Sequence, residues 1–91
     1  MSQRVYFLAH GRVQGVSYRH FAHKKAAEHG VTGWCRNTEN GKVEGEAQGE
    51  EHSIRLFLKE LDKGPTHARV VRLDQESREV QEGEELFVVR R

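Results

Sequence analysis

The order of the predicted helices and strands constrains the fold of this chain more than any other feature. Two helical segments, with a β-hairpin between them and further strands outside, must pack together within 91 residues. A chain of this length buries too little surface to place each helix between two other layers. We therefore predict a single α+β domain over residues 1–91, in which both helices pack on one face of an antiparallel sheet.

The spacing of apolar residues gives the position of each segment. Ser17 is the expected N-cap of the first helix and Gly30 its C-terminal stop, while Gly11 ends the first strand. Asn40 and Gly41 form the Asn-Gly pair that is typical of a hairpin turn. The predicted strands are residues 4–10, 31–37, 42–48, 68–74 and 85–90, and the predicted helices are residues 18–29 and 50–63. This order is that of a ferredoxin-like βαββαβ sandwich with an extra C-terminal strand.

Composition narrows the class of protein. Fifteen basic and 14 acidic residues give a net charge of +1, so nothing indicates a nucleic acid or an anionic membrane as partner. The single cysteine excludes an internal disulfide, and no apolar stretch is long enough for a membrane span. We expect a soluble, cytoplasmic monomer.

Residues 11–19 are the strongest indication of function. Gly11 and Gly15 allow the backbone to turn with its N–H groups inward, and the helix that follows offers free N–H donors and partial positive charge. Arg19, on the first turn of that helix, adds a planar set of donors that fits phosphoryl oxygens. The segment therefore predicts a pocket for a phosphate or a carboxylate. It has neither the Gly-Lys-Ser/Thr ending of a nucleotide P-loop nor the Gly-x-Gly-x-x-Gly pattern of dinucleotide sites.

Other polar residues have simpler interpretations. His20 and His23 lie three apart on one helix with no acidic or histidine cluster beside them, which favours solvated helix surface over a metal site. Cys35 has no partnering base and is interpreted as a small packed residue. The alternative role of Arg19 is a surface ion pair with a carboxylate, and the alternative role of Asn37 is to form the hairpin turn.

Two segments of the chain resemble the signatures of the acylphosphatase family. They are Gly11-Arg12-Val13-Gln14-Gly15-Val16-Ser17-Tyr18-Arg19 and Gly33-Trp34-Cys35-Arg36-Asn37-Thr38-Glu39-Asn40-Gly41-Lys42-Val43, the second continuing to Gly49. The resemblance extends from end to end of the chain. It implies a ferredoxin-like fold and the hydrolysis of acyl phosphates to a carboxylate and inorganic phosphate.

The resemblance also implies roles for individual residues. Arg19 corresponds to the phosphate-binding arginine of the family and Asn37 to its water-positioning asparagine. The phosphate cradle corresponds to Arg12, Val13, Gln14, Gly15, Val16, Ser17 and Tyr18. A small acyl phosphate is the expected substrate and inorganic phosphate the product and competitive ligand, with no cofactor and no metal.

The residues favour the same chemistry without the resemblance. A carboxylate leaving group needs no general acid, so one arginine, a set of N–H donors and an amide that holds water suit an activated phosphate. Asn37 cannot deprotonate that water, and we expect the proton to pass to an oxygen of the substrate's phosphate.

A non-catalytic binding module is the competing hypothesis, because fold does not fix function. The strand at 42–48 has two glutamates and no aromatic residue, which argues against RNA recognition, and one cysteine excludes a Cys-x-x-Cys metal carrier. A domain that binds carbamoyl phosphate for a partner is a closer alternative. Such domains usually belong to much larger chains, so a chain of this length favours the free enzyme.

Overall fold

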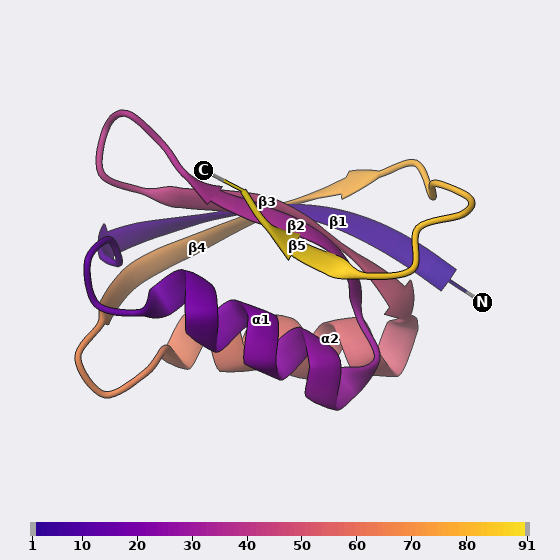
Figure 1. Cartoon of the computed structure of the whole chain (residues 1–91), viewed down its shortest axis with the longest axis horizontal. Coiled ribbons are helices and arrows are strands. Elements are labelled where there is room, and N and C mark those ends of the chain that lie inside the picture. The colour runs from indigo at the N-terminus through magenta and orange to yellow at the C-terminus, as the bar shows by residue number, and fades with distance from the viewer. Residues whose placement is uncertain (1, 91) are drawn as a thin grey trace.

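The computed structural model describes residues 2–90 and confirms the predicted order of helices and strands (Figure 1). The elements are β1 (Ser2–Arg12), α1 (Tyr18–His29), β2 (Thr32–Asn37), β3 (Val43–Glu50), α2 (Glu51–Lys63), β4 (Arg69–Arg78) and β5 (Phe87–Val89). Among these residues, neither helix is long and apolar enough to cross a membrane.

The strands form one sheet in the order β4-β1-β3-β2-β5, and both helices cover the same face of it (Figure 1). Pairing is antiparallel from β4 to β2, as a ferredoxin-like sandwich requires. β5 differs from the all-antiparallel expectation, since it pairs in parallel with β2. β4 is antiparallel to β1, whereas β2 runs in the same direction as β1. The chain reverses direction after β4, so β5 runs in the same direction as β2.

The core lies between the helices and the inner face of the sheet. Alternate residues of the strands point toward the helices, and α2 contributes the apolar stripe that its 3.6-residue period predicts. The ring of Phe57 is central, with centroids 6.2 Å from Phe7 and 5.6 Å from Phe87. Its contacts join β1, α2 and β5. The fully or nearly buried apolar residues include Val5, Phe7, Ala9, Cys35, Val43, Ala47, Ile54, Phe57, Leu61 and Phe87.

Two predicted strand limits were wrong, and one predicted capping hydrogen bond is not made. β1 does not end at Gly11 but passes through it in a bulge, with Gly11 at φ 123° opposite Val70. Ser17 occupies the N-cap position of α1, but its φ is 63° and its side chain makes no capping hydrogen bond. β4 extends to Arg78, because its polar end is an edge strand that pairs with β1. The predicted limits of α1 and its stop at Gly30 are confirmed.

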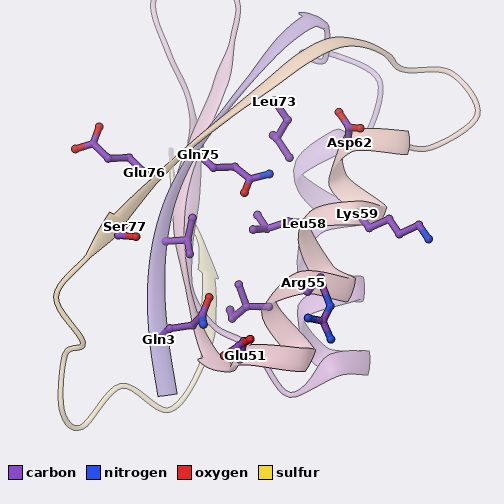
Figure 2. Close-up of a pocket in the computed structure, with 12 residues that line it drawn as sticks. Gln3, Glu51, Arg55, Leu58, Lys59, Asp62, Leu73, Gln75, Glu76 and Ser77 are labelled. Carbon is purple, nitrogen blue, oxygen red and sulfur yellow. The ribbon is translucent and has the colours of Figure 1, made fainter. Parts of the chain in front are cut away.

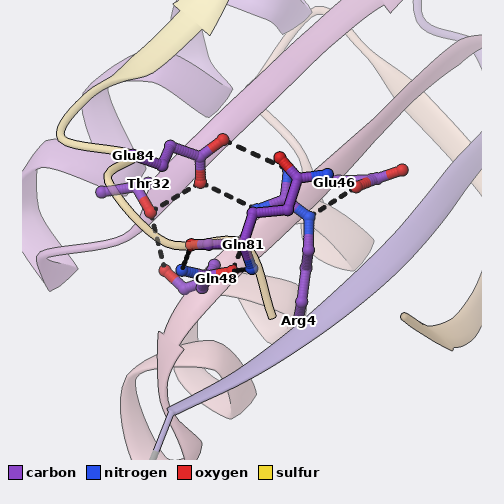
Figure 3. Close-up of polar contacts among 6 residues, drawn as sticks. All are labelled: Arg4, Thr32, Glu46, Gln48, Gln81 and Glu84. Carbon is purple, nitrogen blue, oxygen red and sulfur yellow. Dashed lines mark hydrogen bonds and ion pairs between the residues drawn. The ribbon is translucent and has the colours of Figure 1, made fainter. Parts of the chain in front are cut away.

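A buried arginine joins the outer face of the sheet to the connection between β4 and β5 (Figure 3). Arg4 is 2% exposed and ion-paired with both Glu46 and Glu84. Its guanidinium donates to Glu84 at 2.9 and 3.2 Å and to Gln48 at 3.1 Å. Gln48 exchanges two hydrogen bonds of 2.8 Å with the backbone of Gln81. Charge-assisted bonds of this kind are the stronger ones, so this network fixes the chain just before β5.

The environment of Glu84 makes part of this network sensitive to acid. Burial alone would raise the pKa of Glu84, but hydrogen bonds from Arg4 and Thr32 outweigh it and hold the pKa below its ordinary value. A carboxyl group whose pKa is lowered by folding stabilises the protein above its unfolded-state pKa. That stability is lost as the pH falls through the folded-state pKa.

We therefore predict that Glu84→Gln lowers the free energy of unfolding by about 2 kcal/mol at pH 7, because it removes a charge-assisted pair. The difference from the parent protein should shrink as the pH is lowered from about 5 toward 3, since the parent's carboxylate then becomes protonated. Urea unfolding at a series of pH values measures both. Glu82→Gln, an exposed position in the same connection, is the matched control. A pH-independent difference between the Glu84 variant and the parent would contradict the assignment.

Candidate functional site

Two hollows on the surface are candidates for the site. The larger, of about 670 Å³, lies between α2 and β4 and is lined by charged side chains of both signs (Figure 2). The smaller, of about 520 Å³, lies at the start of α1. Volume favours the first, but the second holds the residues that the sequence singled out. It is lined by Val13, Gly15, Ser17, Tyr18, Arg19, His20, His23, Asn37, Phe87 and Val89. We take the second as the candidate site and call it the α1 pocket.

The loop between β1 and α1 forms one wall of the α1 pocket. Gly15 at φ 72° and Ser17 at φ 63° have left-handed backbones, and Val16 between them does not. Alternation of this kind turns successive N–H groups toward one concave side, where they attract an anion. With normal hydrogen-bond geometry, the N–H groups of residues 14–17 donate to no acceptor within residues 2–90. These donors are therefore available to a ligand.

Not every residue of the predicted cradle lines the α1 pocket. Gln14 instead joins the loop to the β2–β3 turn, because its amide donates to the carbonyl oxygens of Thr38 and Lys42, each at 2.8 Å. Arg12 is exposed at the end of β1, and Val16 packs against the core. Some residues of the predicted cradle therefore line the pocket, whereas others hold the loop in place.

Arg19 lies in the pocket and has no carboxylate partner in the part of the chain that the structure describes. Its Nη1 donates to the backbone oxygen of Arg90 at 3.0 Å, which ties the arginine to the segment after β5. An arginine has five N–H donors, so this bond leaves others for a ligand. The salt bridges among residues 2–90 include none to Arg19. With residues 2–90 as partners, the surface ion pair considered as an alternative is therefore not formed.

Asn37 has an unsatisfied side chain at the last position of β2. Its Oδ1 is buried and has no hydrogen-bond partner within residues 2–90, which costs about 1–3 kcal/mol for a group of this kind. The turn that follows is closed by Thr38, whose Oγ1 accepts from the N–H of Lys42 at 3.0 Å and bonds Asn40 Oδ1 at 2.5 Å. The side chain of Asn37 does not form the turn, so its orphan acceptor points to a ligand in the pocket.

Two neighbouring residues are excluded from the chemistry. Burial raises the pKa of the Cys35 thiol to about 12, although the charge of Arg19 acts in the opposite direction. The thiol is therefore protonated at neutral pH and behaves as the packed residue that the sequence predicted. His10 hydrogen-bonds Asp74 at 2.7 Å and does not line the pocket.

Sequence reasoning missed three parts of the α1 pocket. Phe87 and Val89 of β5 form its apolar wall, and the backbone oxygen of Arg90 holds Arg19. The apolar C-terminal run was visible in the sequence, but its pairing with β2 was not. His20 and His23 are exposed, as predicted, yet both also line the pocket.

The family model, the curated relatives and a solved structure agree on one family. The acylphosphatase family model matches residues 5–89. A curated acylphosphatase of Thermus thermophilus is 49% identical, covering 90% of this chain and 88% of its own length. One from Geobacillus thermodenitrificans is 41% identical, with 93% and 90% covered. A crystal structure of acylphosphatase from Bacillus subtilis superposes with a TM-score of 0.93 at 27% identity, over 100% of both chains.

The backbone at Gly15 provides a test of the loop. A methyl group there would meet nothing within 4 Å, so Gly15→Ala strains the left-handed backbone without filling space. We predict a loss of about 1 kcal/mol in stability and weaker binding of inorganic phosphate in isothermal titration calorimetry, because the loop N–H groups lose their shared direction. Gly30→Ala, at a similar φ of 67° and equally open, should lose similar stability and keep its phosphate affinity. Equal effects of both variants on phosphate binding would contradict this role of the loop.

Proposed function

The chain belongs to the acylphosphatase family, and we propose that it hydrolyses acyl phosphates without a metal ion in the α1 pocket. In this proposal Arg19 and the N–H groups of residues 12–18 hold the phosphate, and Asn37 positions the attacking water. The entire chain, residues 1–91, acts as one domain, with inorganic phosphate as product and competitive ligand. The buried Oδ1 of Asn37, which has no hydrogen-bond partner among residues 2–90, carries the proposal most directly.

The leaving group determines what the pocket must supply. The conjugate acid of a carboxylate has a pKa of about 4, so the carboxylate departs without being protonated. No general acid is then needed. Phosphoryl transfer to water through a loose transition state depends mainly on positioning and on charge stabilisation.

Charge stabilisation comes from Arg19 and the loop. The arginine is tied at one donor to the backbone of Arg90, which leaves its other N–H groups for a ligand. Within residues 2–90, the lining of the pocket has no acidic residue. Backbone N–H groups at the loop and at the start of α1 add donors whose orientation is fixed before the substrate binds. Both sets of donors stabilise the negative charge on the phosphoryl oxygens in the transition state of the transfer.

Positioning of the water falls to Asn37. Its Oδ1 is an acceptor, so it receives a hydrogen bond from one O–H of the water and leaves the oxygen lone pair free to attack phosphorus. The P–O bond to the acyl group breaks, and its electron pair leaves on the carboxylate. The second proton of the water passes to a phosphate oxygen, because an amide cannot accept it as a base. The products are the carboxylate and dihydrogen phosphate, so atoms and charges balance.

Substitution of the two central residues tests this division of roles. Asn37→Ala should lower kcat for benzoyl phosphate by about 10²- to 10³-fold, the usual effect of removing one positioned polar group. Its free energy of unfolding should stay the same or rise, since an unsatisfied buried acceptor is removed. Arg19→Ala should lower kcat/KM and also weaken inhibition by phosphate. Kinetics in the presence of a chelator and urea unfolding measure these effects.

Asn40→Ala is the matched control, because the side chain of Asn40 bonds within the turn and does not line the pocket. It should alter stability and leave kcat intact. Loss of stability in Asn37→Ala with retained kcat would assign that residue a structural role. A parent protein that binds phosphate without hydrolysing benzoyl phosphate would be a phosphate-recognition module, and the catalytic proposal would fail.

A further inference from the structure

Two histidines extend the polar side of the α1 pocket beyond Arg19. His20 and His23 are exposed and both line the pocket. Neither has a hydrogen bond or an ion pair with any of residues 2–90, unlike His10 and His29, which contact Asp74 and Glu60. Their imidazoles are therefore free to bind a ligand in the pocket.

The position of the histidines places them beside the acyl part of a bound substrate. His23 follows Arg19 by four residues, which puts it on the same side of α1, about 6 Å further along the helix axis. Phe87 and Val89 form the apolar wall of the same pocket. A substrate whose phosphate contacts Arg19 would thus extend between an apolar surface and two N–H donors.

The charges that surround the histidines favour an anion. Within residues 2–90, the pocket lining contains no carboxylate, and its only ionisable side chains besides the two histidines are those of Arg19 and Tyr18. The Tyr18 hydroxyl donates to the carbonyl of Leu61 at 2.7 Å, and burial raises its pKa. The loop, β2 and β5 add no ionisable group to the lining, and the Arg90 guanidinium lies over Trp34.

A metal ion fits these residues poorly. Zinc takes three or four ligands from protein, and among residues 2–90 no group of three or more His, Cys, Asp and Glu is suitably placed. Two histidines without a third ligand suit a carboxylate or phosphoryl oxygen better, because imidazole N–H groups donate to both.

We propose that His20 and His23 bind a second anionic group on the acyl part of the substrate. The preferred substrates are then acyl phosphates that carry a carboxylate or a further phosphate beyond the bond that breaks. This inference rests on the proposed acylphosphatase function and adds to it a substrate class.

A matched pair of substrates tests the proposal. Benzoyl phosphate and 4-carboxybenzoyl phosphate differ by one carboxylate, and the ratio of their kcat/KM values reports how that charge is recognised. The double variant His20→Ala/His23→Ala removes both imidazole N–H donors. We expect it to lower the kcat/KM for 4-carboxybenzoyl phosphate relative to that for benzoyl phosphate roughly threefold to tenfold. His52→Ala, at an exposed histidine of α2 that contacts Arg55, is the control and should leave the ratio unchanged.

The outcomes separate the two proposals. An unchanged ratio in a folded double variant that still hydrolyses benzoyl phosphate would overturn the histidine subsite alone. No hydrolysis of either substrate by the parent protein would overturn the proposed function and the subsite with it. Circular dichroism of the double variant excludes misfolding as the cause of a change.

Discussion

The pairing of β1 with β3 at the centre of the sheet determines where the site is assembled. Ala9 of β1 lies opposite Val43 of β3, and Val43 lies opposite Asn37 of β2. Neighbouring strands are about 4.8 Å apart, so Asn37 is about 10 Å from Ala9. β1 and β2 both run against β3, and they therefore end at the same edge of the sheet. This register alone brings the loop after β1 to the asparagine, and Gln14 then fixes the loop to the turn beyond it.

Local signals in the sequence were sufficient for most of the fold. The limits of α1, the stripe of α2 and the hairpin each depend on residues close together in the chain, and the structure has all three. Long-range pairing was not predictable in the same way. The polar end of β4 forms a strand because β1 pairs with it. β5 runs parallel to β2 because β4 runs in the direction opposite to β2 and the chain turns back after β4. Arg4 had no sequence signal, since its partners lie 42 to 80 residues away.

The candidate site shows the same contrast. The glycines and Arg19 stood out because a loop and a helix start are local features, whereas Phe87, Val89 and the backbone of Arg90 reach the α1 pocket only through the sheet. Ser17 was predicted as an N-cap from its residue type. Its left-handed backbone instead serves the turn of the loop, and a capping bond is not made. The prediction from residue type failed at Ser17 because the loop of the pocket requires a left-handed backbone there.

Two unfavourable features lie together in the α1 pocket, and both favour ligand binding over stability. Ser17 has a backbone conformation that a residue with a Cβ rarely adopts, and Asn37 keeps a buried acceptor unpaired. Phe57 and the network of Arg4 lie outside the pocket lining, and their contacts offset these costs. Because contacts elsewhere stabilise the fold, the loop N–H groups and the Asn37 acceptor can stay oriented for a ligand at one edge of the sheet.

Hydrolysis in ¹⁸O-labelled water tests the central claim most directly, because it shows which atom the water attacks. Attack on phosphorus, by a water that Asn37 positions beside a phosphate held by Arg19, places the label in inorganic phosphate and leaves the carboxylate unlabelled. Mass spectrometry of both products after a single turnover distinguishes them. Label in the carboxylate would mean that water attacks the acyl carbon, and the roles assigned to Arg19 and Asn37 would be wrong.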